Sequence, residues 1–292
     1  MEFASKKKEV LGTVVEIKIP RADSKIFSLL FDEFKRIETK YTRFRDDSYL
    51  AELNRKLGRW QKTDEETLFL IKKSLEIRKN TDNSFDITLL DTLEKLGYDK
   101  EYSFKEKKSL FYFNLDFSKE KIKVRGNEIF LKKRIELGGI GKGYAIDKAA
   151  QIIEKNGILD YYINAGGDIF ARHKNKKKEW TILLEHPDFT DRAIGKIGIN
   201  NLSITSSSSN RRKWGQNHHL IDAKTKKPRN DVKSIFIIAK KTIEADAYAT
   251  ALFTSGFNKA IELAKKLNLS VLIISNENKV YKSEGFEVEY FN

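Results

Sequence analysis

Ile135-Glu-Leu-Gly-Gly-Ile-Gly-Lys-Gly143 lies near the middle of this chain, where a strand gives way to a helix. A helix is expected to follow over residues 144–156. A strand over residues 161–164 then runs into Ala165-Gly-Gly-Asp168, a second glycine-rich turn. The pattern predicts a central unit in which glycine-rich turns join a sheet to a helix.

The rest of the chain alternates between short strands and amphipathic helices on both sides of this unit. Strands are expected at residues 10–19, 110–115, 122–124, 128–131, 180–184, 196–199, 202–205, 234–239, 271–274 and 280–281. Helices are expected at residues 25–40 with Ser24 as the cap, 48–54, 65–80, within 85–97, 245–253 and 258–267. The elements do not repeat in a regular βαβ order, and no linker divides the chain. The fold class is therefore expected to be α+β, with mixed, largely antiparallel sheets and flanking helices in a single unit over residues 1–292 that has room for two interlocked subdomains.

Composition excludes several functional classes. The 292 residues include no cysteine, which excludes disulfides, thiol catalysis and cysteine-based metal sites. The formal net charge is +14, from 56 Lys and Arg against 42 Asp and Glu. These basic residues are spread along the chain, without a recognised nucleic-acid module or a stacking platform of aromatic residues. A solvated basic surface is therefore favoured, and no nucleic-acid partner is expected.

The chain shows no sign of membrane insertion. Its longest apolar runs, such as Ser270-Val-Leu-Ile-Ile-Ser275, have the length of a strand and not of a membrane span. Lys6-Lys7-Lys8 near the start has no apolar stretch behind it. As written, the chain is expected in the cytoplasm, or outside it if an export segment has been removed.

Two glycine-rich stretches offer binding chemistry, each with a structural alternative. The first, at Glu136–Gly143, places Lys142 and backbone amides at a helix start, where an anion is favoured. It matches neither a Walker loop nor a dinucleotide fingerprint, so a tight structural turn is an equal alternative. In the second stretch, Asp168 suits a hydroxyl, a ring nitrogen or a water molecule, and an ordinary β-turn is equally consistent.

Three further stretches carry polar groups at suggestive spacings. Asp246 and Thr250 are four residues apart, so on a helix both oxygens share a face and, with a backbone carbonyl, could form a hard-oxygen site for Mg²⁺. Asp and Thr are also common on helix faces, so from the spacing alone a helix face without a metal is the simpler interpretation. The run Thr205–Ser209 precedes Arg211, Arg212 and His219 and suits a diphosphate, although a flexible serine loop is the simpler interpretation. Asp86, within Ser84–Thr88, is either a functional carboxylate or a helix cap.

The order and spacing of these motifs are more specific than any one of them. From about residue 11 to residue 256 the chain resembles the FAD:protein FMN transferases, the ApbE-like family. The resemblance rests on Leu11-Gly-Thr13, Phe44–Asn54, Ser84-Phe-Asp-Ile-Thr88, Gly139-Ile-Gly-Lys-Gly-Tyr-Ala-Ile-Asp147, Asn164-Ala-Gly-Gly-Asp168, His219-Leu-Ile-Asp222 and Ala245-Asp-Ala-Tyr-Ala-Thr250.

The resemblance implies an enzyme that transfers FMN from FAD to a Thr or Ser hydroxyl of a partner protein, with Mg²⁺ as cofactor and AMP as the leaving group. It implies that Asp246, Thr250 and the carbonyl of Gly139 hold the metal. The residues implied for the FAD site are Leu11, Phe44, Ser84, Phe85, Asp86, Glu136, Lys142, Asp168 and Leu220. The candidates for a direct catalytic role are Asp86, His219 and Lys142, and the sequence does not choose between Asp86 and His219 as the proton acceptor.

The chain departs from the family pattern at several positions. Leu11 replaces the usual Met, and Glu136 stands where Asp is frequent. The usual Thr-Ser-Gly is Thr205-Ser-Ser207, and the usual Asp-Pro-x-Thr-Gly is Asp222-Ala-Lys-Thr-Lys226. These changes leave two alternatives open: a Mg²⁺-dependent FAD pyrophosphatase that yields FMN and AMP, and a flavin-binding protein without catalysis.

Overall fold

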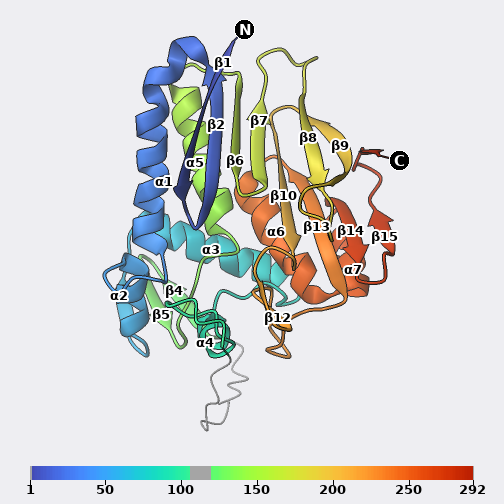
Figure 1. The fold of residues 1–292 in the computed structure, drawn as a ribbon. Coiled ribbons are helices and arrows are strands. Elements are labelled where there is room, and N and C mark those ends of the chain that lie inside the picture. The colour runs from blue at the N-terminus through green and yellow to red at the C-terminus, as the bar shows by residue number, and fades with distance from the viewer. Residues whose placement is uncertain (1, 106–119, 292) are drawn as a thin grey trace.

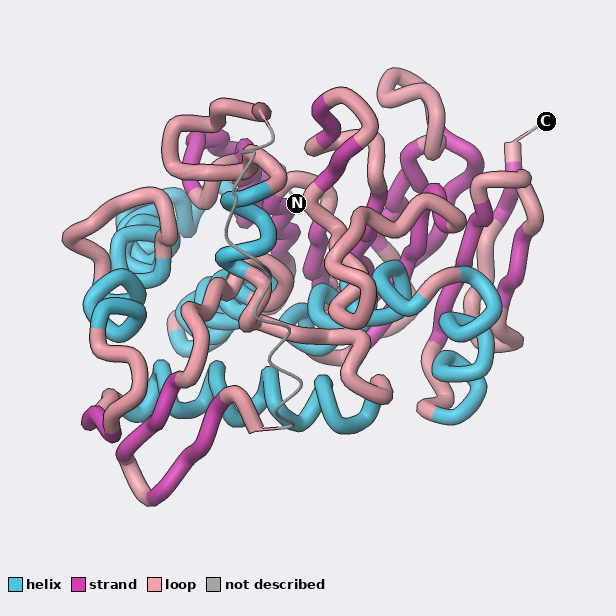
Figure 2. The backbone as a smooth tube through the Cα atoms, turned by 90° about the horizontal axis from the view of Figure 1, so that it is seen from below, coloured by secondary structure: helices cyan, strands magenta, loops and turns pink. Residues whose placement is uncertain are grey.

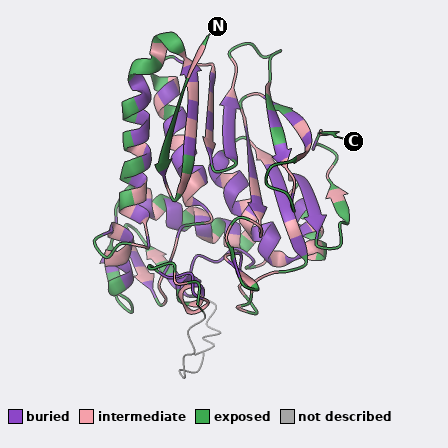
Figure 3. Cartoon of the chain, in the orientation of Figure 1, coloured by how far each residue is buried: buried purple, intermediate pink, exposed green. Residues whose placement is uncertain are grey.

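The computed structural model describes residues 2–105 and 120–291, and its largest element is an eight-stranded antiparallel sheet (Figure 1). The strand order is β1-β2-β6-β7-β10-β13-β14-β15. The strands are β1 (Phe3–Val10), β2 (Thr13–Pro20), β6 (Tyr161–Ala165), β7 (Asp168–Arg172), β10 (Leu202–Ser208), β13 (Val232–Ala239), β14 (Ser270–Ser275) and β15 (Val280–Lys282). The central strands are buried, which Figure 3 shows as a purple band.

Helices cover one face of this sheet, and the view from below in Figure 2 separates the two layers. The covering helices are α1 (Phe27–Tyr41), α5 (Gly141–Lys155), α6 (Thr242–Ser255) and α7 (Phe257–Lys266). The helix α3 (Glu65–Asn80) packs against α6. Two short helices, α2 (Tyr49–Arg55) and α4 (Leu90–Lys95), lie at the same end of the molecule as α3 (Figure 1). Among the described residues no helix is long and apolar enough to cross a bilayer.

A small sheet covers part of the opposite face. It has the order β16-β9-β8, with β16 (Glu289–Tyr290), β9 (Ala193–Ile199) and β8 (Trp180–Glu185). Ile182 and Leu184 of β8 pack with Ile169 and Ile204 of the main sheet in one apolar cluster. The other strands are β3 (Trp60–Lys62), β4 (Ile122–Arg125) and β5 (Glu128–Leu131), which form a separate sheet, and the paired β11 (Lys213–Trp214) and β12 (Asn217–His218).

The predicted fold class is confirmed: the sheets are antiparallel and helices flank them. Several predicted elements differ in detail. The strand expected at residues 10–19 is interrupted, because Leu11 and Gly12 both have positive φ and form the turn between β1 and β2. Ser24 does not cap the first long helix, since Arg21–Ile26 is a 3₁₀ turn and α1 starts at Phe27. The strand expected at residues 110–115 lies outside the described residues.

Candidate functional site

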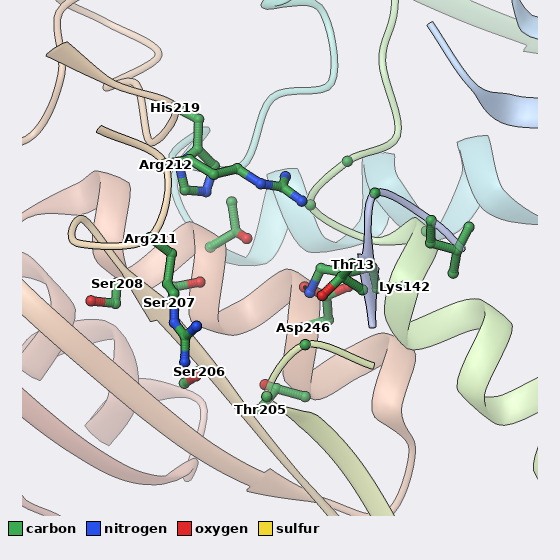
Figure 4. Close-up of a pocket in the computed structure, with 18 of the residues that line it drawn as sticks. Thr13, Lys142, Thr205, Ser206, Ser207, Ser208, Arg211, Arg212, His219 and Asp246 are labelled. Atoms are coloured by element: carbon green, nitrogen blue, oxygen red, sulfur yellow. Dashed lines mark ion pairs between the residues drawn. The ribbon is translucent and has the colours of Figure 1, made fainter. Parts of the chain in front are cut away.

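A cavity of about 1320 Å³ opens between the turn of β1 and β2, the start of α5, α6 and the loops around β10. The residues predicted for the site that line it are Leu11, Phe44, Ser84, Phe85, Asp86, Glu136, Gly139, Lys142, His219, Leu220, Asp246 and Thr250. Asp168 does not line the cavity, but its carboxylate forms an ion pair with Lys142, which does. Residues from segments far apart in the sequence therefore meet around one hollow (Figure 4).

The start of α5 is held at this cavity by a reciprocal contact with α6. The Asp147 carboxylate accepts hydrogen bonds from the backbone N–H groups of Thr242 and Ile243, at 2.8 and 3.0 Å. In return, Asp246 Oδ2 accepts a hydrogen bond of 2.9 Å from the backbone N–H of Gly143. Each helix start thus receives a carboxylate from the other helix, which satisfies otherwise unpaired amides. This contact fixes Asp246 beside Lys142 at the cavity wall.

Glycine at position 143 is required by this helix contact. A Cβ atom built there would lie 2.4 Å from the carbonyl oxygen of Thr242, closer than any side chain can approach. The amide of Gly138 is also used, because it donates to Glu136 Oε2 at 2.7 Å. At these positions the stretch acts as the structural turn that was one of the two alternatives, because the amides of Gly138 and Gly143 are both bonded within the chain.

The predicted metal ligands come together at the end of the cavity formed by α6. A Cβ atom built on Gly139 would lie 3.2 Å from Thr250 Oγ1, so the backbone of Gly139 passes close to that hydroxyl. Asp246 and Thr250 lie four residues apart on α6, as expected. Carboxylate, hydroxyl and carbonyl oxygens are the ligands that Mg²⁺ prefers, usually with substrate phosphates in the remaining positions. The donor set fits Mg²⁺, although the described residues contain no group of three His, Cys, Asp or Glu side chains that could hold a metal.

Lys142 is the cation nearest to this donor set. Its Nζ pairs with Asp168 Oδ2 and lies 3.9 Å from Asp246 Oδ1. Burial lowers the pKa of Lys142 and the nearby Arg212 lowers it further, while Asp246 opposes the change. Because Asp168 itself is buried at the start of β7, the pair is a preformed contact within the wall of the cavity.

Asp86 is committed to structural contacts. Its Oδ1 accepts hydrogen bonds from the backbone N–H and the hydroxyl of Thr88, and its Oδ2 pairs with Lys121 at 2.7 Å. Burial alone would raise the pKa of Asp86, but Lys121 and the hydrogen bonds hold it below its usual value. An ionised carboxylate that is bonded in this way is a poor proton acceptor. Asp86 therefore supports the loop that presents Ser84 and Phe85.

His219 is a neutral imidazole with one uncommitted ring nitrogen. Its Nδ1 is buried and has no hydrogen-bond partner among the described residues. Burial, and then the charge of Arg212, lower the pKa of His219 to about 3, so the imidazole is neutral at pH 7. An anionic ligand beside Arg212 and Lys142 would offset their charges and raise this pKa. Because its Nδ1 is unbonded while both oxygens of Asp86 are bonded, His219 is the less committed of the two candidates for the proton acceptor.

The serine run is part of the sheet. Thr205–Ser208 belongs to β10 and pairs with β13, so the expected flexible loop is wrong. The sequence alone does not indicate a strand here, because serine has no strong preference for strands. After β10, Arg211 pairs with Glu185, and Arg212 reaches across the cavity toward Gly12 (Figure 4). In the described part of the chain Arg212 forms no ion pair, although its charge partly opposes the rise that burial causes in the pKa of Glu136, so it can contact an anion in the cavity.

An aromatic wall beside Phe44 was not among the predicted site residues. Tyr102 stacks on Phe44 with ring centroids 4.7 Å apart, and Tyr98 contacts both rings. The guanidinium of Arg43 lies 4.3 Å from the ring centres of Phe44 and Tyr98. Tyr98, Tyr102 and Phe104 all line the cavity. The signal was the clustering of aromatic residues within Tyr98–Phe104, which offers flat apolar surface to a planar ligand.

The second glycine-rich turn is the tight connection between β6 and β7. Gly166 and Gly167 both have positive φ, and a Cβ atom on Gly166 would lie 2.2 Å from Thr13 Oγ1. The β-turn alternative is therefore confirmed. The turn also lines the cavity through Gly166 and Gly167, so it forms part of the wall of the site.

Comparisons with known proteins agree with this geometry. Residues 11–273 match the ApbE family. The FAD:protein FMN transferase of Haemophilus influenzae is 28% identical over 267 residues, covering 84% of this chain and 77% of the relative. That of Buchnera aphidicola (subsp. Schizaphis graminum) is 26% identical over 301 residues, covering 95% and 87%.

Solved structures agree as well. The crystal structure of the ApbE protein from Thermotoga maritima superposes with a TM-score of 0.87 at 26% identity, over 98% of each chain. The flavin transferase ApbE of Vibrio cholerae shares the fold, with a TM-score of 0.84 at 21% identity over 98% of each chain. Since the family match extends over most of the sequence and the predicted site residues meet in one cavity, this chain belongs to the ApbE family.

Proposed function

We propose that this protein is an FAD:protein FMN transferase that moves the FMN part of FAD to a Thr or Ser hydroxyl of an acceptor protein and releases AMP. One observation carries the proposal: residues matched to the family in separate segments line a single cavity, with a neutral histidine and unneutralised positive charge on its walls. Relatives of similar sequence are FAD:protein FMN transferases, and the cavity contains side chains that this reaction requires.

The chemistry is one phosphoryl displacement. The acceptor oxygen forms a bond to the phosphorus of the FMN part, and the bond from that phosphorus to the bridging oxygen of the diphosphate breaks. AMP leaves with this oxygen, and the proton of the acceptor hydroxyl passes to His219. Arg212 and Lys142 bind the diphosphate, so Lys142 exchanges its contact with Asp168 for the substrate. Mg²⁺, held by Asp246, Thr250 and the carbonyl of Gly139, would neutralise charge that develops on the phosphates.

The altered loop after His219 is closed by backbone hydrogen bonds. The backbone N–H of Asp222 donates to Lys227 O, and that of Lys226 donates to Asp222 O, both at 2.9 Å. Lys226, which replaces the usual glycine, has a φ of 61°. A left-handed residue other than glycine costs about 1–2 kcal/mol, which the closed loop tolerates. The loop departures therefore give no support to a loss of catalysis.

The test is incubation with FAD, Mg²⁺ and a protein extract of the source organism, followed by mass spectrometry of the proteins and analysis of the nucleotides. A transferase gives a protein adduct of the mass of FMN, together with AMP. FMN and AMP without an adduct would establish the pyrophosphatase, and unchanged FAD would establish a binding protein.

The metal assignment has its own variant. Asp246→Ala removes the carboxylate oxygens and is expected to lower the rate at saturating Mg²⁺ by about 100-fold or more. Glu244→Ala, on the same helix but paired with Lys73, is the matched control and should retain activity. Full activity of Asp246→Ala would contradict the metal site. FAD binding, measured by quenching of flavin fluorescence, shows whether the variant keeps its cavity.

A further inference from the structure

Strand β8 lies at the edge of the small sheet and along the rim of the cavity. Among the described residues it pairs with β9 alone, so one of its long sides has no strand beside it. The cavity is lined by every residue from Thr181 to Pro187. The unpaired side of a strand thus borders the same hollow that contains Lys142 and His219.

The direction of the backbone groups in β8 follows from β9. Ile194 of β9 accepts a hydrogen bond from the backbone N–H of Phe291, next to β16, so the backbone of Ile194 faces β16. Backbone groups alternate between the two neighbours of an antiparallel strand. Ile197, three residues further on, therefore faces β8, where it stands opposite Ile182. The residues on either side of Ile182 then turn their N–H and C=O groups toward the free edge.

Those two residues, Thr181 and Leu183, also have exposed side chains, and the side chain of Leu183 is 62% exposed. Edge strands are usually protected by charged residues, prolines or short length. The edge strand β1 of the main sheet follows this rule, with Lys6, Lys7 and Lys8 in its middle. β8 has the sequence WTILLE, with no lysine or proline, and its one charged residue, Glu185, stands at the end and pairs with Arg211. The edge beside the cavity is therefore the unprotected one of the two.

The main sheet offers a floor for an extended chain next to β8, because Tyr162 of β6 lies 5.4 Å, between ring centres, from Trp180 at the start of β8. Val14 and Glu16 of β2 and Tyr162 and Asn164 of β6 line the cavity. Val14 is about half exposed, and Tyr162 presents a ring that Lys18 already contacts. A segment placed along β8 over this floor would lie in the same cavity that Lys142 and His219 line.

We infer that the acceptor protein presents an extended segment that adds to β8 as a fourth strand of the small sheet, with its Thr or Ser directed toward His219. This inference rests on the proposed function, because the occupant must be a polypeptide with a reactive hydroxyl. Strand addition suits many acceptor sequences, since main-chain hydrogen bonds supply the affinity and side chains at alternate positions supply the specificity.

The first experiment uses a synthetic pool of peptides of about twelve residues, each with one central Thr and randomised flanks, long enough to pair along the strand. The pool is incubated with the protein, FAD and Mg²⁺, and peptides that gain FMN are identified by mass. The best peptide is then remade with single N-methyl groups at successive backbone amides. Strand addition predicts loss of labelling at every second position and little change between, because only alternate amides face β8. A scan without this period overturns the inference.

The second experiment compares Leu183→Glu with Val280→Glu. Val280 lies in β15, the far edge strand of the main sheet, is 55% exposed and does not line the cavity. Leu183→Glu is expected to raise the KM for the selected peptide by about tenfold or more, with the KM for FAD unchanged, while Val280→Glu changes neither. Equal peptide KM values for both variants contradict docking at β8.

Failure of the docking and failure of the activity give different results. If proteins in the source extract gain FMN but no peptide of the pool does, the inference fails and the transferase stands. If neither gains FMN, the proposed function fails first. Leu183→Pro, which removes an outward N–H, provides a backbone variant, and its FAD binding shows whether the cavity is intact.

Discussion

At the scale of single residues, the state of His219 sets the pH dependence. With a pKa of about 3, its imidazole stays neutral across the physiological range. We therefore expect kcat/KM for FAD, which reports the free enzyme, to show no inflection near pH 6.5. His219→Asn should keep FAD binding and lower the transfer rate by about 100-fold or more. The matched control is His173→Asn, since His173 bonds Asp160 outside the cavity. A normal transfer rate in His219→Asn would contradict its role as proton acceptor.

The same histidine affects stability. Its pKa in the folded state lies below the unfolded value, so between about pH 6.5 and pH 3 the unfolded chain binds more protons. Its contribution to stability is complete above about pH 6.5 and is lost as the pH falls. On lowering the pH from 7, the free energy of unfolding should therefore fall less for His219→Asn than for the wild type. Denaturant titrations at several pH values measure this.

Lys226 gives a prediction in the alkaline range. Burial, and then the neighbouring Lys121, lower the pKa of Lys226 from 10.5 to about 8. Between pH 8 and pH 10.5 the lysine is protonated in the unfolded chain but not in the folded one. The destabilisation caused by burying Lys226 is therefore complete below pH 8 and disappears above pH 10.5. Lys226→Met should stabilise the protein at pH 7 by about 1–2 kcal/mol, after discounting for partial exposure, and by less at pH 10. The exposed neighbour variant Lys227→Met is the control. A gain for Lys226→Met that is independent of pH would contradict this cause.

At the scale of elements, the contact between α5 and α6 positions the site, and two glycines in α5 test it. Gly143→Ala forces a Cβ atom against the carbonyl of Thr242, and we expect a loss of about 2–4 kcal/mol in the free energy of unfolding. Gly141→Ala meets no atom within 4 Å, and should be neutral or stabilising by up to about 1 kcal/mol. Thermal and denaturant unfolding of the two variants give the comparison. Similar stabilities would show that the helices can separate without cost.

The elements also show what the sequence could reveal. Helices such as α3 were predictable because an apolar stripe and a cap, here Asp64, act locally. The strand β1 was missed because its lysine-rich middle is exposed at an edge and carries no apolar alternation. The strand expected at residues 202–205 is confirmed, but β10 extends through Ser206–Ser208, because pairing with β13, a long-range contact, overrides the weak local preference of serine.

The site divides in the same way. Asp246 and Thr250 were predictable from helical spacing, since both lie on one turn of α6. The aromatic wall at Tyr98 and Tyr102 and the commitment of Asp86 to Lys121 depend on contacts between distant segments, which no local pattern contains.

At the scale of the whole molecule, the cavity couples ligand binding to the stability of the entire chain. Its walls come from segments between Lys7 and Thr254, which include the main sheet, its helices and the small sheet. A ligand that binds here binds the assembled chain and not its separate parts. We therefore expect one cooperative unfolding transition, consistent with the proposal of a single unit over residues 1–292.

FAD should shift this transition as a whole. At a concentration of about 100 times its Kd, FAD adds about 2.7 kcal/mol to the free energy of unfolding, which raises the Tm by several degrees for a chain of this size. Mg²⁺ should increase the shift in the wild type and not in Asp246→Ala, because its effect requires the carboxylate at the start of α6. Scanning calorimetry with and without each ligand makes the measurement. Two transitions, of which FAD moves one, would show instead that the chain divides into two units and that the cavity belongs to one of them.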